Sequence, residues 1–144
     1  MKTKLMKYFY AMLILTCFTS VGAQVKLGVG SSIIPEFKAF GAQVRGAYQH
    51  SDVVSFSGSF SYYFKKESNL GIDLDAQFKL IEKSSFSIAP FVGATIRRIN
   101  ASLGTGLQAG FFIVMPTDGV DVYIEPKAIL DDNTALVISG GLYF

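Results

Sequence analysis

The sequence has 144 residues and a formal net charge of +2, which leaves room for a single domain. Half of the residues are hydrophobic and 17% are charged, a composition that is oily for a soluble domain of this size. The single cysteine, Cys17, lies in an N-terminal apolar stretch, so the chain after it can form neither a disulfide nor a thiolate metal site. The nearly neutral charge gives no electrostatic reason to expect a nucleic acid as partner.

Residues 1–23 have the pattern of a cleaved secretory signal. Their apolar stretch, residues 8–18, is too short to span a bilayer stably, which disfavours a signal anchor. Small residues at Val21-Gly22-Ala23 fit a cleavage site that leaves Gln24 as the new N-terminus. The basic end of the signal consists of Lys2, Lys4 and Lys7. We therefore predict an exported protein whose residues 24–144 form one domain, with ten basic and eleven acidic residues.

The segment Val54–Phe64 shows the clearest secondary-structure pattern of the chain. Apolar residues occupy every second position, and serines fill most of the positions between them. The segment Leu70–Leu80 repeats this alternation, with Asp73 and Asp75 on its polar face. A period of two is typical of β-strands, and no useful length of the chain after residue 23 shows the helical period.

Six further segments alternate in the same way, less strictly: Val25–Ile33, Lys38–Gln49, Ser85–Arg97, Ser102–Val114, Val120–Ile129 and Thr134–Phe144. Short polar or turn-forming segments separate them, as in hairpins. The pattern predicts an all-β fold of eight antiparallel strands in up-and-down order. Pro90 and Pro126 fall inside strands and lack the N–H of a ladder bond, so we expect a bulge or irregular pairing at each.

Two architectures fit this pattern: a soluble barrel with its apolar face inside, and a transmembrane β-barrel with that face outside. The segments approach the roughly 9–11 residues of a tilted membrane strand, and charges keep to the polar face. Large rings on the apolar face also collect near strand ends, as in membrane-interface girdles. With the N-terminus in the periplasm, we expect a periplasmic girdle of Tyr48, Phe56, Phe78, Phe86, Phe111 and Phe144, and an opposite girdle of Phe40, Tyr62 and Phe64. We therefore predict an eight-stranded transmembrane β-barrel.

The polar face carries charges of both signs, and charges inside a narrow barrel need partners. We expect an ionic plug in the lumen made of Arg45, Asp73, Asp75, Glu125 and Lys127. A second cluster, at the periplasmic mouth, is expected from Lys26, Lys79 and Asp121. Because Asp73 and Asp75 share a face, an acid–base pair or a cation site is the alternative to a plug.

Three other patterns favour structural interpretations. His50, the only histidine, lies in a predicted turn with no serine, cysteine or carboxylate placed to complete a catalytic set. A row of serines suggests a hydroxyl ladder for a solute, but eight strands enclose an interior that side chains just fill; the row is Ser55, Ser57, Ser59 and Ser61. Three glycines have loose phosphate-loop spacing but lie in a strand, which argues against a nucleotide site; they are Gly104, Gly106 and Gly110.

The last strand resembles the C-terminal signature of bacterial outer-membrane barrels, in which apolar residues alternate back from a final aromatic residue. Here those residues are Phe144, Leu142 and Ile138. The stretch Ala89–Ala94 is similar to the Pro-aromatic-x-Gly segment of the porin-like outer-membrane β-barrel family. The resemblance to small barrels of the OmpX/OmpA type implies residence in a Gram-negative outer membrane, contact with its lipid, and recognition of the last strand by the barrel-assembly machinery. It implies no single activity, since members include anchors, adhesins and a few enzymes.

We therefore predict a non-enzymatic envelope component, structural or partner-docking, with a side-chain-filled lumen and with no cofactor, metal or nucleic acid. A narrow conduit for ions or a small solute is the first alternative, and a soluble periplasmic ligand-binding barrel with reversed faces is the second. Nothing in the sequence names a protein partner.

Overall fold

The computed structural model describes residues 25–65, 69–99, 102–130 and 134–144. The predicted signal, residues 1–23, lies outside them. Within the described ranges, no helix is long and apolar enough to cross a membrane.

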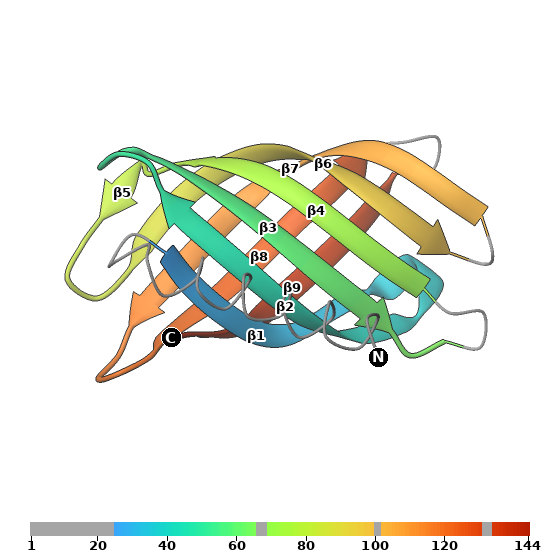
Figure 1. The fold of residues 1–144 in the computed structure, drawn as a ribbon, viewed down its shortest axis with the longest axis horizontal. Helices are drawn as coiled ribbons and strands as arrows, with labels where there is room; N and C mark the ends of the chain where they lie inside the picture. Colours follow the sequence, from blue (N-terminus) through green and yellow to red (C-terminus); the bar gives the residue numbers. More distant parts are fainter. Residues whose placement is uncertain (1–24, 66–68, 100–101, 131–133) are drawn as a thin grey trace, which may run out of the picture.

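Eight long strands form a closed antiparallel barrel (Figure 1). Neighbours in sequence pair in succession, β4 pairs with β6, and β1 pairs with β9 to close the sheet. The long strands are β1 (Val25–Ile34), β2 (Ala39–Gln49), β3 (Val54–Tyr63), β4 (Asn69–Phe78), β6 (Ser87–Ile99), β7 (Ser102–Pro116), β8 (Asp121–Leu130) and β9 (Ala135–Tyr143). The prediction of eight up-and-down strands is confirmed. The end at which β1 begins and β9 ends is called the terminal mouth here, and the opposite end is the far mouth.

Two short elements were not predicted. A 3-10 turn, η2 (Pro35–Phe37), links β1 and β2 at the far mouth. At the terminal mouth β4 ends at Phe78, and the two-residue strand β5 (Ile81–Glu82) pairs with the beginning of β6. The predicted strand over Leu70–Leu80 therefore ends two residues early.

The two strand prolines behave differently. At Pro90 the register with β7 runs without a break, so the expected irregular pairing occurs only on the other side of β6. The pairing of β6 with β4 ends at Phe91 and that with β5 begins at Ile88, so no ladder partner on that side meets the missing N–H. At Pro126 the pairing with β7 is interrupted between Lys127 and Ile124, and it resumes in the same register without a bulge.

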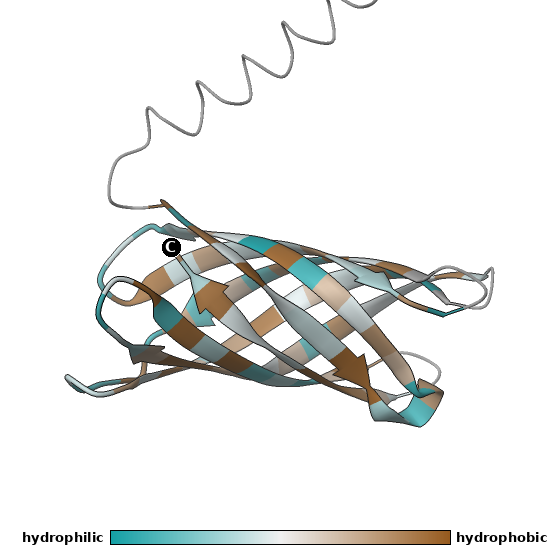
Figure 2. Cartoon of the chain, turned by 90° about the horizontal axis from the view of Figure 1, so that it is seen from below, coloured by the Kyte–Doolittle hydropathy of each residue, from teal (hydrophilic) through white to brown (hydrophobic). Residues whose placement is uncertain are grey.

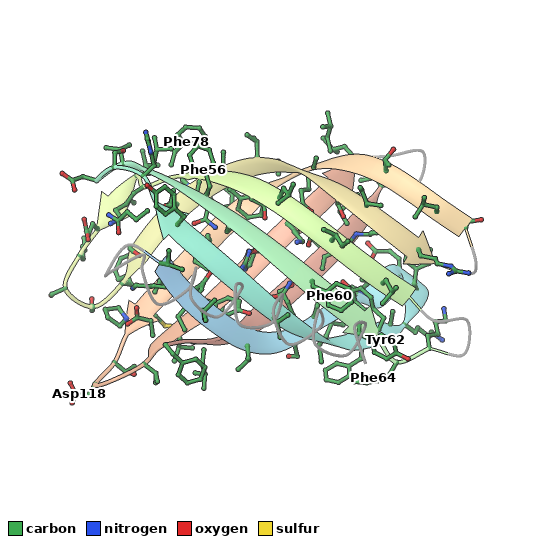
Figure 3. All side chains as sticks on the ribbon, in the orientation of Figure 1. Phe56, Phe60, Tyr62, Phe64, Phe78 and Asp118 are labelled. Carbon is green, nitrogen blue, oxygen red and sulfur yellow. The ribbon has the colours of Figure 1, made fainter. Side chains whose placement is uncertain are left out.

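The faces are oriented as predicted, with the apolar face outside. Leu74 of β4 is 66% exposed, whereas Asp73 and Asp75 of the same strand are buried and point inward. Figure 2 shows hydrophobic and hydrophilic residues alternating along the strands. Large outward rings lie near both ends: Figure 3 places Phe56 and Phe78 at one end, and Phe60, Tyr62 and Phe64 at the other.

The seam between β1 and β9 depends on two opposed glycines. Gly30 and Gly141 face one another in the register, and the Tyr123 hydroxyl lies above them. A Cβ added at Gly30 would lie against the Gly140 carbonyl oxygen and 2.6 Å from the Tyr123 hydroxyl oxygen. The last residue continues the seam, since the Phe144 N–H donates to the Leu27 carbonyl oxygen at 2.8 Å. Glycine is needed here because the backbones and a ring approach closely.

We predict that Gly30→Ala impairs barrel closure, because its methyl group would displace the backbone of β9 or the ring of Tyr123. The folded species that migrates differently on unboiled SDS gels should be reduced or lost. Gly46→Ala is the matched control, since the nearest atom to a Cβ there is 3.8 Å away. Equal folding of the two variants would contradict the role assigned to the seam.

Candidate functional site

Six charged side chains meet in the lumen at mid-barrel. Asp73 and Asp75 come from β4, and Glu125 and Lys127 come from β8. Residues two apart on a strand share a face, so each pair projects inward together. Arg45 of β2 and Arg97 of β6 complete the set, and all six residues are at most 6% exposed. Three cations and three anions give this lumen ionic cluster a formal charge of zero.

Ion pairs join these side chains into one network. The Arg45 guanidinium bonds to the Glu125 carboxylate, and the Lys127 ammonium lies 2.6 Å from Asp73 and 2.9 Å from Glu125. Two longer pairs, Arg45–Asp75 and Arg97–Asp73, each span 3.8 Å. The structure thus brings together all five residues proposed for the plug and adds Arg97. The sequence put Arg97 on the polar face, but its inclusion depends on how the strands are staggered around the barrel.

Neutral polar groups surround the charges. The Gln108 amide donates to Asp75, and the Ser59 hydroxyl donates to Asp73 at 3.3 Å. The Gln43 amide donates to Ser59 and to Ser61, each at 3.3 Å. The Gln77 amide donates to Ser57 at 3.0 Å. These serine hydroxyls are therefore engaged within the plug and do not line an open path.

A layer of inward-facing rings separates this cluster from the terminal mouth. The Arg45 guanidinium carbon lies 4.8 Å from the Phe112 ring centroid and 5.2 Å from that of Tyr123, within cation–π range. The Phe112 and Tyr123 rings stack at 5.5 Å, and Tyr143 packs on both. The alternation predicts Tyr123 on the polar face, whereas Phe112 and Tyr143 were not among the residues expected in the lumen. Alternation carried the signal, because Phe112 and Tyr143 follow the outward residues Phe111 and Leu142.

An apolar cluster fills the far mouth. Its buried members come from β1, β2, β3, β8 and β9, and Phe37 of η2 packs against them. The Glu36 carboxylate fixes η2 to β9 by accepting a bond from the Leu136 N–H at 2.9 Å. The buried residues are Ile34, Ala39, Tyr63, Ile129, Ala135 and Val137. The described residues therefore fill the lumen at this end on the side of these five strands.

A cavity of about 220 Å³ opens at the terminal mouth. Lys26 pairs there with Asp121 at 2.6 Å, whereas Lys79 pairs with Glu82 at 3.2 Å. The three residues expected to form one cluster at this mouth, Lys26, Lys79 and Asp121, all line this cavity. They do not form one network, because Lys79 pairs with Glu82 and not with Asp121. Phe86 also lines this cavity, half-buried and outside the strands, so its expected place in the outward girdle is wrong. The other girdle rings of this end, Tyr48, Phe56, Phe78, Phe111 and Phe144, are all exposed.

The remaining candidates stay isolated. His50 is exposed in the turn after β2, and its ring lies 6.4 Å from that of Tyr48 and 6.1 Å from that of Phe56. Gly104, Gly106 and Gly110 lie within β7, with no helix beside them. No group of three or more His, Cys, Asp or Glu residues in the described ranges could hold a metal ion. The lumen carboxylates are occupied by cations and amides, an arrangement suited to holding strands together.

The architecture recurs in solved structures at low sequence identity. The N-terminal β-barrel domain of Pseudomonas aeruginosa OprF matches with a TM-score of 0.63 and 15% identity, covering 83% of this chain and 96% of that domain. The Yersinia pestis outer membrane protein Ail, solved in a phospholipid bilayer nanodisc, matches at 0.56 and 13%, covering 83% and 98%. The outer membrane enzyme PagL matches at 0.56 and 9%, covering 82% and 96%. No family model matches the sequence, and no curated protein matches it.

These likenesses show the fold of small eight-stranded transmembrane β-barrels. The same fold carries an enzyme as well as other outer-membrane proteins, so the fold alone does not assign an activity.

We predict that Glu125→Gln destabilises the barrel by about 3–5 kcal/mol, because Arg45 and Lys127 keep their buried charges and lose a shared partner. The measurement is the free energy of unfolding in urea, with the barrel in lipid vesicles. Glu82→Gln is the control, because its side chain is 68% exposed and its pair with Lys79 is worth less than about 1 kcal/mol. A cost at Glu125 no larger than that at Glu82 would show that the network contributes little.

Proposed function

We propose that the protein is an integral outer-membrane β-barrel without enzymatic activity, a structural or partner-docking component of the envelope. The observation that carries the proposal is the combination of an apolar outer surface with a lumen filled by a neutral ionic network. An apolar exterior suits lipid, and a filled interior leaves no passage through the barrel.

The outer surface supports residence in a membrane. Outward side chains along the middle of the strands are apolar, and the large rings lie toward both ends, as in interfacial girdles. A soluble barrel would place its apolar residues inside, so the arrangement disfavours a soluble ligand-binding barrel. The proposed signal over residues 1–23 supports export, and the terminal residues Phe144, Leu142 and Ile138 are the proposed signal for the barrel-assembly machinery.

The side chains also support a non-enzymatic role. Asp73 forms an ion pair with Lys127, and Glu125 forms one with Arg45, so neither carboxylate is free to act on a substrate. The ring of His50, the one candidate base, lies beside two girdle rings, and the hydroxyl of the adjacent Ser51 accepts bonds from the Val53 and Val54 N–H groups. The mouth cavity is the feature that favours the alternative of a conduit, but the ionic cluster lies between this cavity and the far mouth, and an apolar cluster narrows the far mouth itself.

We predict that Leu74→Arg blocks insertion into the outer membrane, since Leu74 lies mid-strand on the outer surface. An arginine at the bilayer midplane costs about 2–4 kcal/mol. The readout is the heat-modifiable band in the outer-membrane fraction, and Leu74→Ala is the control for loss of the side chain. Normal insertion of the arginine variant would mean that this face does not meet lipid.

We also predict that the wild-type barrel shows no steady conductance in planar bilayers. The matched variant replaces Arg45 and Glu125 together with alanine, which keeps the net charge and empties part of the plug, and it should leak ions. Insertion of both proteins is checked by heat-modifiable migration. If the wild-type protein carried a steady current as large as that of the double variant, the lumen would act as a conduit and the proposal of a plug would be wrong.

A further inference from the structure

The outer surface at the far mouth carries rings and cations side by side. Phe40, Tyr62 and Phe64 point outward from β2, from β3 and from the residue after it, and each is more than 40% exposed. The Phe64 ring lies 5.5 Å from Tyr62 and 6.2 Å from Phe40, so the three rings form one continuous surface. Figure 3 shows Tyr62 and Phe64 together at this end. With Lys38, Lys65 and Arg98 they are called the far-rim patch.

Two of the cations lie at the end of the ring cluster. Lys38 sits between η2 and β2 with φ of 48°, the one non-glycine residue with positive φ among those described. The left-handed backbone conformation is less favourable for lysine than for glycine. The chain therefore has a cation at a position where glycine would be more stable. The Lys65 ammonium donates to the Phe37 carbonyl oxygen at 2.8 Å, which holds it next to Lys38 along the rim.

Arg98 is the third cation, on the outward face of β6. Its neighbour Arg97 points into the lumen, whereas Arg98 is exposed between the outward residues Leu70 and Leu103. Leu70 in turn pairs with Tyr62, which places Arg98 two strands, or about 10 Å, from that ring. Arginine on a lipid-facing surface is tolerated only near the interface, where its cost falls to about 0–1 kcal/mol.

The patch is complementary to a ligand with an anionic head and an apolar body. The nearby carboxylate of Glu36 is bonded to the backbone of β9, on the side away from β3 and β6. At the terminal mouth, by contrast, Lys26 and Lys79 face the cavity and are paired with acids. Among the described residues, the cations of the far-rim patch therefore differ from those of the terminal mouth, which are paired with acids in the cavity.

We propose that the far-rim patch binds a phosphate-bearing anionic lipid, with acyl chains against the rings, the phosphate beside Lys38 and Lys65, and Arg98 on the other side of the rings. Lysine supplies point charges to phosphate, and arginine supplies a fork of donors. The inference rests on the proposed function, because the patch meets lipid only in an inserted barrel. The lipid belongs to the leaflet at the far mouth.

The test uses the full barrel in phosphatidylcholine vesicles, after its heat-modifiable band has shown insertion. Spin-labelled phosphatidic acid is added, and the motionally restricted fraction is measured by electron paramagnetic resonance against spin-labelled phosphatidylcholine. We expect phosphatidic acid to be preferred by about fivefold, the effect of one surface cation. The triple variant Lys38→Gln, Lys65→Gln and Arg98→Gln should lose the preference.

The control variant is Lys26→Gln, Lys79→Gln and Lys83→Gln, which removes the same charge at the terminal mouth and should keep the preference. If the far-rim variant kept the preference for phosphatidic acid, or if the control variant lost it, the proposed lipid binding by the far-rim patch would be contradicted. An equal preference for a spin-labelled fatty acid would show that phosphate is not selected. Complete displacement by inorganic phosphate would assign the site to a free anion. Absence of insertion would contradict the proposed function itself, which is a separate result.

Discussion

Closure of the sheet is the constraint on which the rest of the molecule depends. A strand edge cannot be left unpaired in hydrocarbon, so β1 must meet β9. The contact requires Gly30 opposite Gly141, and the Tyr123 hydroxyl occupies the space that their missing side chains leave. Tyr123 then stacks on Phe112, and both rings cover the guanidinium of Arg45. The backbone seam is thereby connected to the charged centre of the lumen.

Along its axis the lumen is layered in a way that explains the proposed role. From the terminal mouth inward come an open cavity with ion pairs, a layer of rings, the six-residue ionic cluster, a set of hydroxyls and an apolar cluster. The hydroxyl layer consists of Ser32 bonded to Tyr63 at 3.1 Å and to Ser139 at 3.0 Å. The ionic and hydroxyl layers form ion pairs or hydrogen bonds between different strands. Such an interior holds strands together.

The outer surface meets a different requirement. Each depth in a membrane favours a different type of side chain. Apolar residues occupy mid-strand positions, rings lie near both ends, and the cations on the outer surface stand close to the far mouth. The strand bounds leave only short connections between consecutive long strands. The surface at the far mouth that is best suited to binding is therefore the lipid-facing far-rim patch.

The sequence by itself determined the number of long strands, their order and the inward face of the charges that fill the lumen, whereas the outward place of Arg98 on β6 came from the structure. These are local properties of the chain. A period of two can be seen in each segment separately, and the free-energy cost of a charge on the lipid face decides on which side of a strand it lies. The tertiary structure decided which charges meet, because contacts across a barrel depend on the stagger of the strands. It paired Lys79 with Glu82, brought Arg97 to Asp73, turned Phe86 to the cavity and placed Pro90 beside a gap in the ladder. It also placed Phe112 and Tyr123 over Arg45, since that contact joins strands far apart in the chain.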